Sequence, residues 1–172
     1  MIPALLLLLL LPACLAQPAR LSGFRTAGPI YSNAVLDPTT IDGRWQQVAA
    51  FAAPDAPACA PGGADIRRDA AGRLTAALRL CLNGQVLSWS GPLAVTGPGR
   101  LTPATRAPRP LDREWWLLWV DGDLRTMVIG TPDGSFGFVL NRRGPIPPDR
   151  QSAAREIFGW NGYDIGRLTA YW

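Results

Sequence analysis

Side chains that could carry out acid–base or redox chemistry are few in this chain. It has no histidine, and all 17 basic residues are arginine. Histidine is the commonest general base near neutral pH, so the usual route to acid–base catalysis is absent. Asp121 and Asp123 are close together but flank a glycine in a predicted turn, where aspartate is common for backbone reasons. The two glutamates, Glu114 and Glu156, are expected on the surface. We therefore expect no catalytic site.

Cys59 and Cys81 are predicted to form a structural disulfide. They lie at nearly equal distances on either side of the turn sequence Asp69–Gly72, so an antiparallel hairpin folded there brings them face to face. Closing this loop would contribute on the order of 3 kcal/mol, mainly by restricting the unfolded chain. The sequence has no Cys-x-x-Cys and no histidine to complete a metal site, so we expect neither a metal ion nor another cofactor.

The amino terminus indicates export. Residues 4–11 form an apolar run that is too short to span a bilayer and is typical of a signal peptide, which we place at residues 1–16. Two kinds of processing fit. The sequence from Leu11 to Cys14 is similar to a bacterial lipobox, in which case Cys14 carries a lipid anchor. Alternatively, cleavage follows Ala16 and the product is free in the periplasm. Export also permits the disulfide.

The elements that would position these residues are short antiparallel strands. Breaker-free apolar runs alternate with turn sequences such as Asn83-Gly84, Asp121–Asp123 and Thr131–Gly134. The predicted strands are 44–52, 62–68, 73–82, 85–95, 100–105, 114–121, 124–130 and 135–142. Eight such strands can close into an all-β, antiparallel up-and-down barrel that is wide enough for one small ligand. After an extended tether over residues 17–36, residues 37–172 would form the single domain.

A helix is predicted to begin at Pro148 and to pack on the outside of the barrel. Its apolar stripe comprises Ala153, Ala154, Ile157 and Phe158, while Arg150 and Arg155 should face water. A short last strand is expected near residues 168–171.

The turns also predict which residues face each other. Folding at Asn83-Gly84 places Leu80 opposite Leu87, and Leu78 opposite Trp89. Pairing Cys59 with Cys81 places Ile66 opposite Leu74, on the same apolar face. This alternation is what a barrel wall with one apolar side requires. The strand at residues 114–121 is apolar on both faces, so it should be covered on the outside by another element.

Three motifs together give this chain a resemblance to the lipocalin family. They are Gly43-Arg44-Trp45, Asp121–Arg125 and Phe138–Arg142, in the family's order and at appropriate distances. The resemblance covers Asp37 to the carboxyl terminus and departs at Leu124, which replaces the usual aromatic residue. It implies that Gly43, Trp45, Asp121 and Arg142 are structural, with the Arg142 guanidinium over the Trp45 indole at the closed end of the barrel.

The chain is most similar to the bacterial, outer-membrane lipoprotein branch of lipocalins. A helix over Ser152–Phe158 followed by Gly162-Tyr163-Asp164 is typical of that branch. The resemblance implies a non-enzymatic protein of the cell envelope, facing the periplasm, that carries or stores a fatty acid or a lysophospholipid. The formal charge of +4 is spread over small arginine clusters, without the basic stripe of a nucleic-acid-binding surface.

Ligand binding needs only a concave apolar cavity with a few polar groups. The predicted faces and the position of Arg142 give these candidate ligand-binding residues: Leu78, Leu80, Leu87, Trp89, Phe136, Phe138 and Leu140. Two alternatives stay open. The same side chains could fill a solid core, which would make the protein a structural lipoprotein. An enzyme acting on a lipid or isoprenoid would need a polar cluster inside the barrel, and the predicted inward positions contain none.

Overall fold

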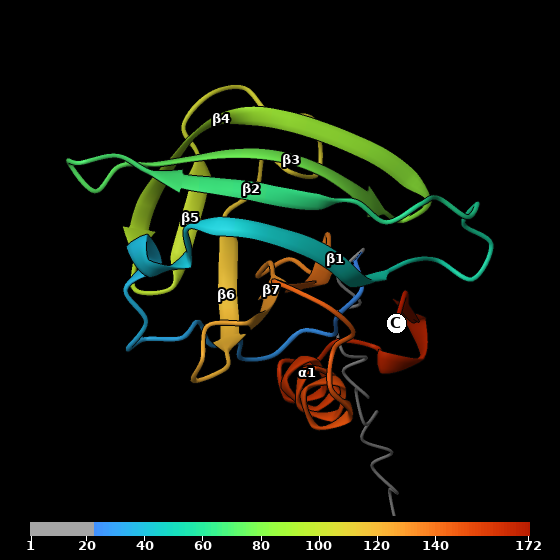
Figure 1. Ribbon diagram of the computed structural model, residues 1–172. Helices are drawn as coiled ribbons and strands as arrows, with labels where there is room; N and C mark the ends of the chain where they lie inside the picture. The colour runs from blue at the N-terminus through green and yellow to red at the C-terminus, as the bar shows by residue number, and fades with distance from the viewer. Residues whose placement is uncertain (1–22) are drawn as a thin grey trace, which may run out of the picture.

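A closed antiparallel barrel forms the body of the protein, as predicted (Figure 1). The computed structural model describes residues 23–172, so the predicted signal peptide, Cys14 and residues 17–22 lie outside the described part. Strand β1 pairs with β8 on one side and with β2 on the other, and this double pairing closes the barrel. The strands are β1 (Gly43–Phe51), β2 (Gly63–Arg68), β3 (Leu74–Leu82), β4 (Gln85–Gly97), β5 (Arg100–Pro103), β6 (Trp115–Val120), β7 (Thr126–Gly130) and β8 (Gly137–Asn141).

The predicted helix is α1 (Pro148–Trp160), and it packs on the outside of the barrel against β6 and β7 (Figure 1). It buries Ala154 and Phe158. The prediction that Arg150 faces water is wrong. Its side chain is only 16% exposed, and its Nη2 lies 2.9 Å from Oδ2 of Asp121, which ties the helix to the β6–β7 turn. The remaining elements are η1 (Pro38–Ile41), η2 (Ile165–Arg167) and β9 (Leu168–Ala170). No helix of residues 23–172 is long and apolar enough to cross a bilayer.

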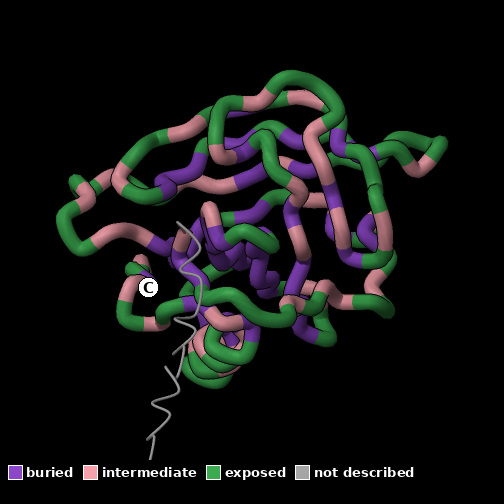
Figure 2. Tube along the Cα trace, turned by 180° about the vertical axis from the view of Figure 1, so that it is seen from behind, coloured by how far each residue is buried: buried purple, intermediate pink, exposed green. Residues whose placement is uncertain are grey.

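Two hydrophobic clusters divide the core. One fills the barrel and the other lies between the barrel wall and α1, and Figure 2 shows buried positions along the strands and exposed ones on the loops. Strand β6 contributes to both, as predicted: Trp115 and Leu117 belong to the inner cluster, and Leu118 to the outer one.

The predicted strand register is confirmed in one hairpin and corrected in the next. Leu80 pairs with Leu87, and Leu78 with Trp89. Ile66, however, pairs with Ala76 rather than with Leu74. The reason is that Cys59 precedes β2, and the segment between them does not continue the ladder. The shift is by two residues, so Ile66 still points into the barrel.

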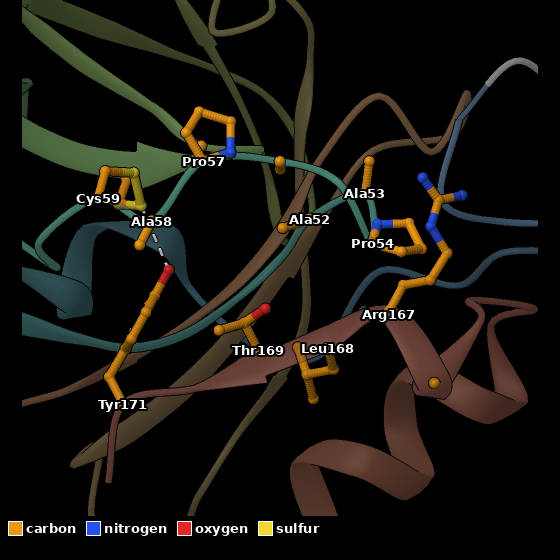
Figure 3. A pocket seen from close by; sticks show the side chains of 14 residues that line it. Ala52, Ala53, Pro54, Pro57, Ala58, Cys59, Arg167, Leu168, Thr169 and Tyr171 are labelled. Carbon is orange, nitrogen blue, oxygen red and sulfur yellow. Dashed lines mark hydrogen bonds between the residues drawn. A yellow bond between two sulfur atoms is a disulfide. The ribbon is translucent and has the colours of Figure 1, made fainter.

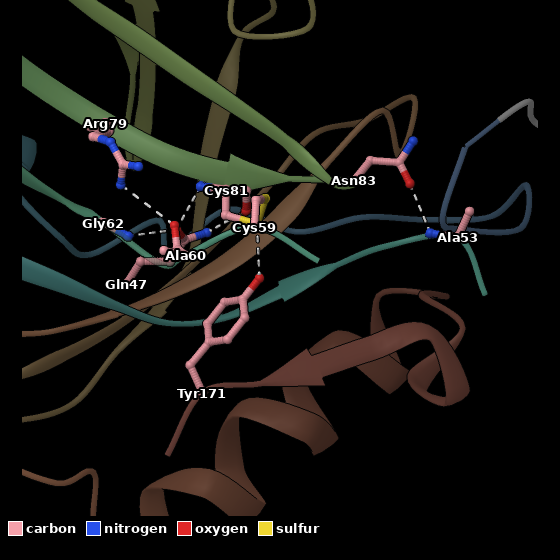
Figure 4. Close-up of a disulfide and its surroundings, with 9 residues drawn as sticks. All are labelled: Gln47, Ala53, Cys59, Ala60, Gly62, Arg79, Cys81, Asn83 and Tyr171. Carbon is pink, nitrogen blue, oxygen red and sulfur yellow. Dashed lines mark hydrogen bonds between the residues drawn. A yellow bond between two sulfur atoms is a disulfide. The ribbon is translucent and has the colours of Figure 1, made fainter. Parts of the chain in front are cut away.

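Strand β1 changes its neighbour halfway along its length. Its first half pairs with β2, and its last residues, Ala49–Phe51, pair with β9. In between, the buried side chain of Gln47 bridges β1 and β3, as Figure 4 shows. Its Nε2 donates to the carbonyl oxygen of Cys81 (2.7 Å), and its Oε1 accepts from the amide of Cys81 (2.8 Å) and from that of Gly62 (3.3 Å). The Gln47 side chain thus makes the hydrogen bonds to the main chain of β3 that a neighbouring strand would otherwise make.

Residues 23–36 lie against the barrel. The predicted tether is therefore part of the folded body over this range. Phe24 is buried, and Arg25 is only 5% exposed. The Arg25 guanidinium donates to the carbonyl oxygens of Asn161 (2.9 Å), Pro132 (2.6 Å), Gly28 (2.9 Å) and Pro29 (3.0 Å). It therefore holds the amino-terminal segment, the β7–β8 turn and the end of α1 together.

Candidate ligand-binding site

The candidate ligand-binding residues all belong to the inner cluster of the barrel. Leu87 is partly buried, and the others are buried: Leu78, Leu80, Trp89, Phe136, Phe138 and Leu140. The alternation along β3, β4 and β8, continued one residue back to Phe136 in the β7–β8 turn, explains this, because every second side chain of a strand points to the same face. Their contact with a ligand stays a prediction.

The free space inside the barrel is about 10 Å³, which is close to the volume that one water molecule needs. Of the candidate residues, Leu78, Leu80, Phe138 and Leu140 line it. Lining residues that the sequence analysis did not name as candidates are Ile41, Ala64, Ile66, Ala76, Leu101, Trp115 and Ile129. Most of these could have been found by extending the alternation through β2, β3, β6 and β7, whereas Ile41 comes from η1 and has no such signal. The lining is wholly apolar. Because the free volume is only about 10 Å³, an acyl ligand enters this lumen only if the wall moves.

The open end of the barrel is the end opposite Trp45 and Arg142. Aromatic side chains and one loop cover it. Trp115 makes edge contacts with Trp89 and Phe136, whose ring centroids lie 6.2 and 6.5 Å away. Leu111, from the loop between β5 and β6, is fully buried beneath them. The Trp115 indole donates to the carbonyl oxygen of Leu111 (2.9 Å), and the Trp89 indole donates to that of Arg106 (3.2 Å). The sequence analysis missed Leu111, because its loop has no strand periodicity.

The closed end has the arrangement that the resemblance implied. The Arg142 guanidinium carbon lies 4.2 Å from the centroid of the Trp45 ring, and Arg142 Nε donates to the carbonyl oxygen of Leu124. Such a shielded cation–π contact contributes about 1 to 2 kcal/mol. Gly43 has φ +125°, and a Cβ there would lie 2.2 Å from Nη1 of Arg142. A glycine is therefore needed at the start of β1 for two reasons, its backbone angle and the guanidinium beside it.

Asp121 and Glu114 have structural partners. Oδ1 of Asp121 accepts from the amides of Arg125 and Thr126, both at 2.6 Å, and so fixes the β6–β7 turn. Hydrogen bonds from Thr96 (2.6 Å) and the Trp116 indole (2.7 Å), the former with the larger effect, lower the pKa of Glu114. A lowered pKa is opposite to what a general acid needs at neutral pH. Within the described residues, no group of three His, Cys, Asp or Glu side chains is placed to hold a metal ion.

Cys59 and Cys81 form the predicted disulfide, with their Cα atoms 5.7 Å apart (Figure 4). It fastens the β1–β2 loop to the end of β3, and the Tyr171 hydroxyl donates to Sγ of Cys81 (3.4 Å). Beside it is a pocket of about 320 Å³ on the outside of the barrel (Figure 3). Alanine and proline side chains of the loop form one wall, and residues 166–171 form the other.

Comparison with known proteins identifies this architecture. Residues 100–171 match the model of the lipocalin-like domain. No curated protein sequence matches the chain. The solved structure of insecticyanin from the tobacco hornworm Manduca sexta is 12% identical, with a TM-score of 0.60, and the match covers 87% of this chain and 86% of that one.

Two further solved structures are similar to this chain. The cockroach allergen Per a 4 is 10% identical, with a TM-score of 0.58 over 84% of this chain and 92% of that one. Lobster apocrustacyanin A1 is 15% identical, with a TM-score of 0.53 over 78% of each chain. This protein therefore has the lipocalin fold, and its carboxy-terminal part carries the sequence pattern of the lipocalin-like domain.

Proposed function

We propose that this protein is a lipocalin that binds a small hydrophobic or amphipathic ligand in its barrel and carries or stores it unchanged. The observation that carries the proposal is the wholly apolar lining of the lumen, from Ile41 at the closed end to Trp115 at the open end. Apolar walls can bury an acyl chain, but they provide no group to attack or protonate it. An enzyme would need at least one such group beside the ligand.

Ligand entry must displace side chains, because the free volume is about 10 Å³. Leu111, from the loop that covers the open end, is fully buried, and exposing it costs about 1.5 to 3 kcal/mol. Burying each methylene contributes about 0.8 kcal/mol, so about eight methylenes contribute near 6 kcal/mol. The burial of a chain of that length or longer therefore exceeds the cost of exposing Leu111 about two- to fourfold, whereas two or three methylenes contribute only about 1.6 to 2.4 kcal/mol and roughly equal it. The energetics favour medium and long acyl chains.

The finer part of the proposal concerns the ligand and the cell compartment. We assign the protein to the bacterial branch of lipocalins, with a fatty acid or a lysophospholipid as ligand, at the cell envelope. The apolar run at residues 4–11 supports export, and the lipobox-like sequence supports anchoring through Cys14 to the outer membrane. The Cys59–Cys81 disulfide is compatible with an oxidising compartment such as the periplasm. Cleavage after Ala16 would instead leave the protein free in the periplasm.

A second candidate is a structural protein with a permanently filled barrel. The small free volume favours it, because a barrel packed to this density needs no ligand for stability. Ala76 provides a test, since it lines the lumen while its neighbour Ala77 is exposed on the outer face. Ala76→Leu adds side-chain volume to the lumen, and Ala77→Leu is the matched control.

The experiment has two parts. The purified protein is extracted with organic solvent and its lipids are identified by mass spectrometry, and a fluorescent fatty acid is titrated into the delipidated wild type and both variants. A carrier yields a displaceable acyl ligand, and binding is lost in Ala76→Leu but kept in Ala77→Leu. Circular dichroism confirms that each variant is folded. Absence of binding by the wild type, together with an empty extract, would overturn the carrier function and favour the filled barrel.

A further inference from the structure

We propose that the β5–β6 loop, residues 104–114, is the gate of the lumen, and that Arg106 and Arg109 on its outer side bind the anionic head group of the ligand. The inference rests on the carrier function proposed above. It adds the route of entry and the charge of the ligand.

The gate loop has an apolar inner side and a basic outer side. Leu111 is fully buried in the inner cluster, and Ala107 packs against the same cluster. Arg106 and Arg109 are exposed on the other side. Removing the loop from its place would therefore expose the lumen to water, and the two guanidinium groups would remain at the edge of the opening.

The β1–β2 loop at the same end of the barrel does not close the lumen. None of its residues, 52–62, is buried. It is also fastened from outside: the Cys59–Cys81 disulfide joins it to β3, and the amide of Ala53 donates to Oδ1 of Asn83 (2.7 Å). Moving this loop would open no path into the barrel.

The β7–β8 turn does contribute to the closure, through Phe136, but it is held rigidly. The Tyr163 hydroxyl accepts from the amide of Thr131 (2.8 Å) and lies 2.9 Å from the carbonyl oxygen of Phe136. Arg25 donates to Pro132, and the amide of Phe24 donates to Gly134 (2.7 Å). These buried contacts fix the turn to the amino-terminal segment and to the residues after α1.

Few contacts hold the gate loop to the rest of the barrel. Over residues 104–113 they are the hydrogen bond from the amide of Ala104 to Pro92 (2.8 Å) and the two indole hydrogen bonds from Trp89 and Trp115. At the end of the loop, next to β6, the Glu114 carboxylate accepts from Thr96 (2.6 Å) and from the Trp116 indole (2.7 Å). One exposed ion pair joins Arg113 to Asp133 at 3.5 Å. Water can replace each of these polar contacts when the loop opens, so the burial of Leu111 is the main term that keeps it closed.

An anionic head group fits the outer side of the gate. A groove of about 710 Å³ is lined by Arg106, Arg109 and Asp112, among other residues of the loop. Nε of Arg109 lies 3.5 Å from Oδ2 of Asp112, whereas Arg106 has no ion-pair partner within residues 23–172. A carboxylate or a phosphate monoester on the end of an acyl chain can pair with Arg106, and can compete with Asp112 for Arg109.

Leu111→Ala tests the gate, with Leu118→Ala as the matched control. Both leucines are buried, but Leu118 lies on β6 in the outer cluster, between the barrel wall and α1. Stopped-flow fluorescence measures the association rate of a fluorescent fatty acid with each variant. Leu111→Ala should raise this rate about tenfold, because less apolar surface is exposed on opening, while Leu118→Ala should leave it within about twofold. Equal rates for both variants would overturn the gate.

Arg106→Gln combined with Arg109→Gln tests the head-group site, with Arg73→Gln in the β2–β3 turn at the opposite end as control. Dodecanoate, dodecyl phosphate and dodecanol compete with the probe. The double variant should weaken both anions about three- to tenfold and leave dodecanol unchanged. A larger loss for dodecyl phosphate than for dodecanoate would assign a phosphate head group, and the reverse a carboxylate. Equal losses for dodecanol would overturn the site. If no probe binds the wild type, the carrier function itself fails.

Discussion

Gln47 offers a sharp test of how this barrel is held together where β1 and β3 have no strand between them. Its side chain has 3% of its surface exposed and satisfies both main-chain groups of Cys81, the amide and the carbonyl. Those two groups point toward β1, and β2 pairs with β3 only up to Arg79. Gln47→Leu keeps approximately the same volume and removes both hydrogen bonds.

The structure sets the size of the effect. A buried main-chain group without a partner costs about 1 to 3 kcal/mol, so the two groups of Cys81 together cost about 2 to 6 kcal/mol. The amide of Gly62 adds little, because its 3.3 Å hydrogen bond lies in a partly exposed place. For a domain of this size, 1 kcal/mol corresponds to roughly 2 to 4 °C in Tm. We expect Gln47→Leu to lower Tm by roughly 4 to 24 °C.

The assay is urea and thermal unfolding followed by circular dichroism with the disulfide intact. The neighbouring Gln46 is exposed on the same strand, so Gln46→Leu is a control with identical chemistry, expected to change the free energy of unfolding by less than about 0.5 kcal/mol. If both variants unfold at the same urea concentration, the Gln47 side chain does not replace a strand and the reasoning fails.

Three more predictions concern single residues. Gly43→Ala should lower the free energy of unfolding by about 2 to 3 kcal/mol in urea, because φ is +125° and the new Cβ meets the guanidinium at the closed end, whereas Gly122→Ala, with open space around it, should be neutral. Arg25→Met should cost about 3 kcal/mol in the same assay, because it leaves one buried and three partly buried carbonyl groups without their donor; Arg44→Met, at an 88% exposed side chain, is the control. Burial raises the pKa of Tyr163 to about 12, and an unfolded tyrosine ionises near pH 10, so the contribution of Tyr163 to stability should be fully present below about pH 10 and be lost between about pH 10 and 12. Urea unfolding across that range checks this, and an equal fall in Tyr163→Phe would refute it.

The strands and their faces were predictable because their signals are local. The Asn83-Gly84 turn determines the β3–β4 register, and alternation along β3 then determines which leucines point inward. Most of the lumen could be predicted from this, including Leu78, Leu80, Phe138 and Leu140.

Other features depend on contacts between distant parts of the chain. Arg150 was expected to face water because helix periodicity reflects only the neighbouring residues of the helix. Its partner Asp121 lies in the β6–β7 turn, far away in the sequence. Arg25 lies in a proline-rich stretch without periodicity, and its hydrogen-bond acceptors Pro132 and Asn161 lie 107 and 136 residues further along. Sequence patterns do not show which residues far apart in the chain come into contact in the fold.

The sequence by itself determined the eight-stranded barrel, its apolar inner face and the disulfide, because turns and alternation are properties of neighbouring residues. The stacking of Arg142 on Trp45 was implied by the resemblance to lipocalins. Only the tertiary structure decided how much of the lumen is filled. That volume depends on how Leu111 and the aromatic side chains from separate strands pack against one another. The closure of the barrel by the β5–β6 loop is therefore a property of the folded molecule, since a loop without periodicity acquires its inner and outer sides only by packing.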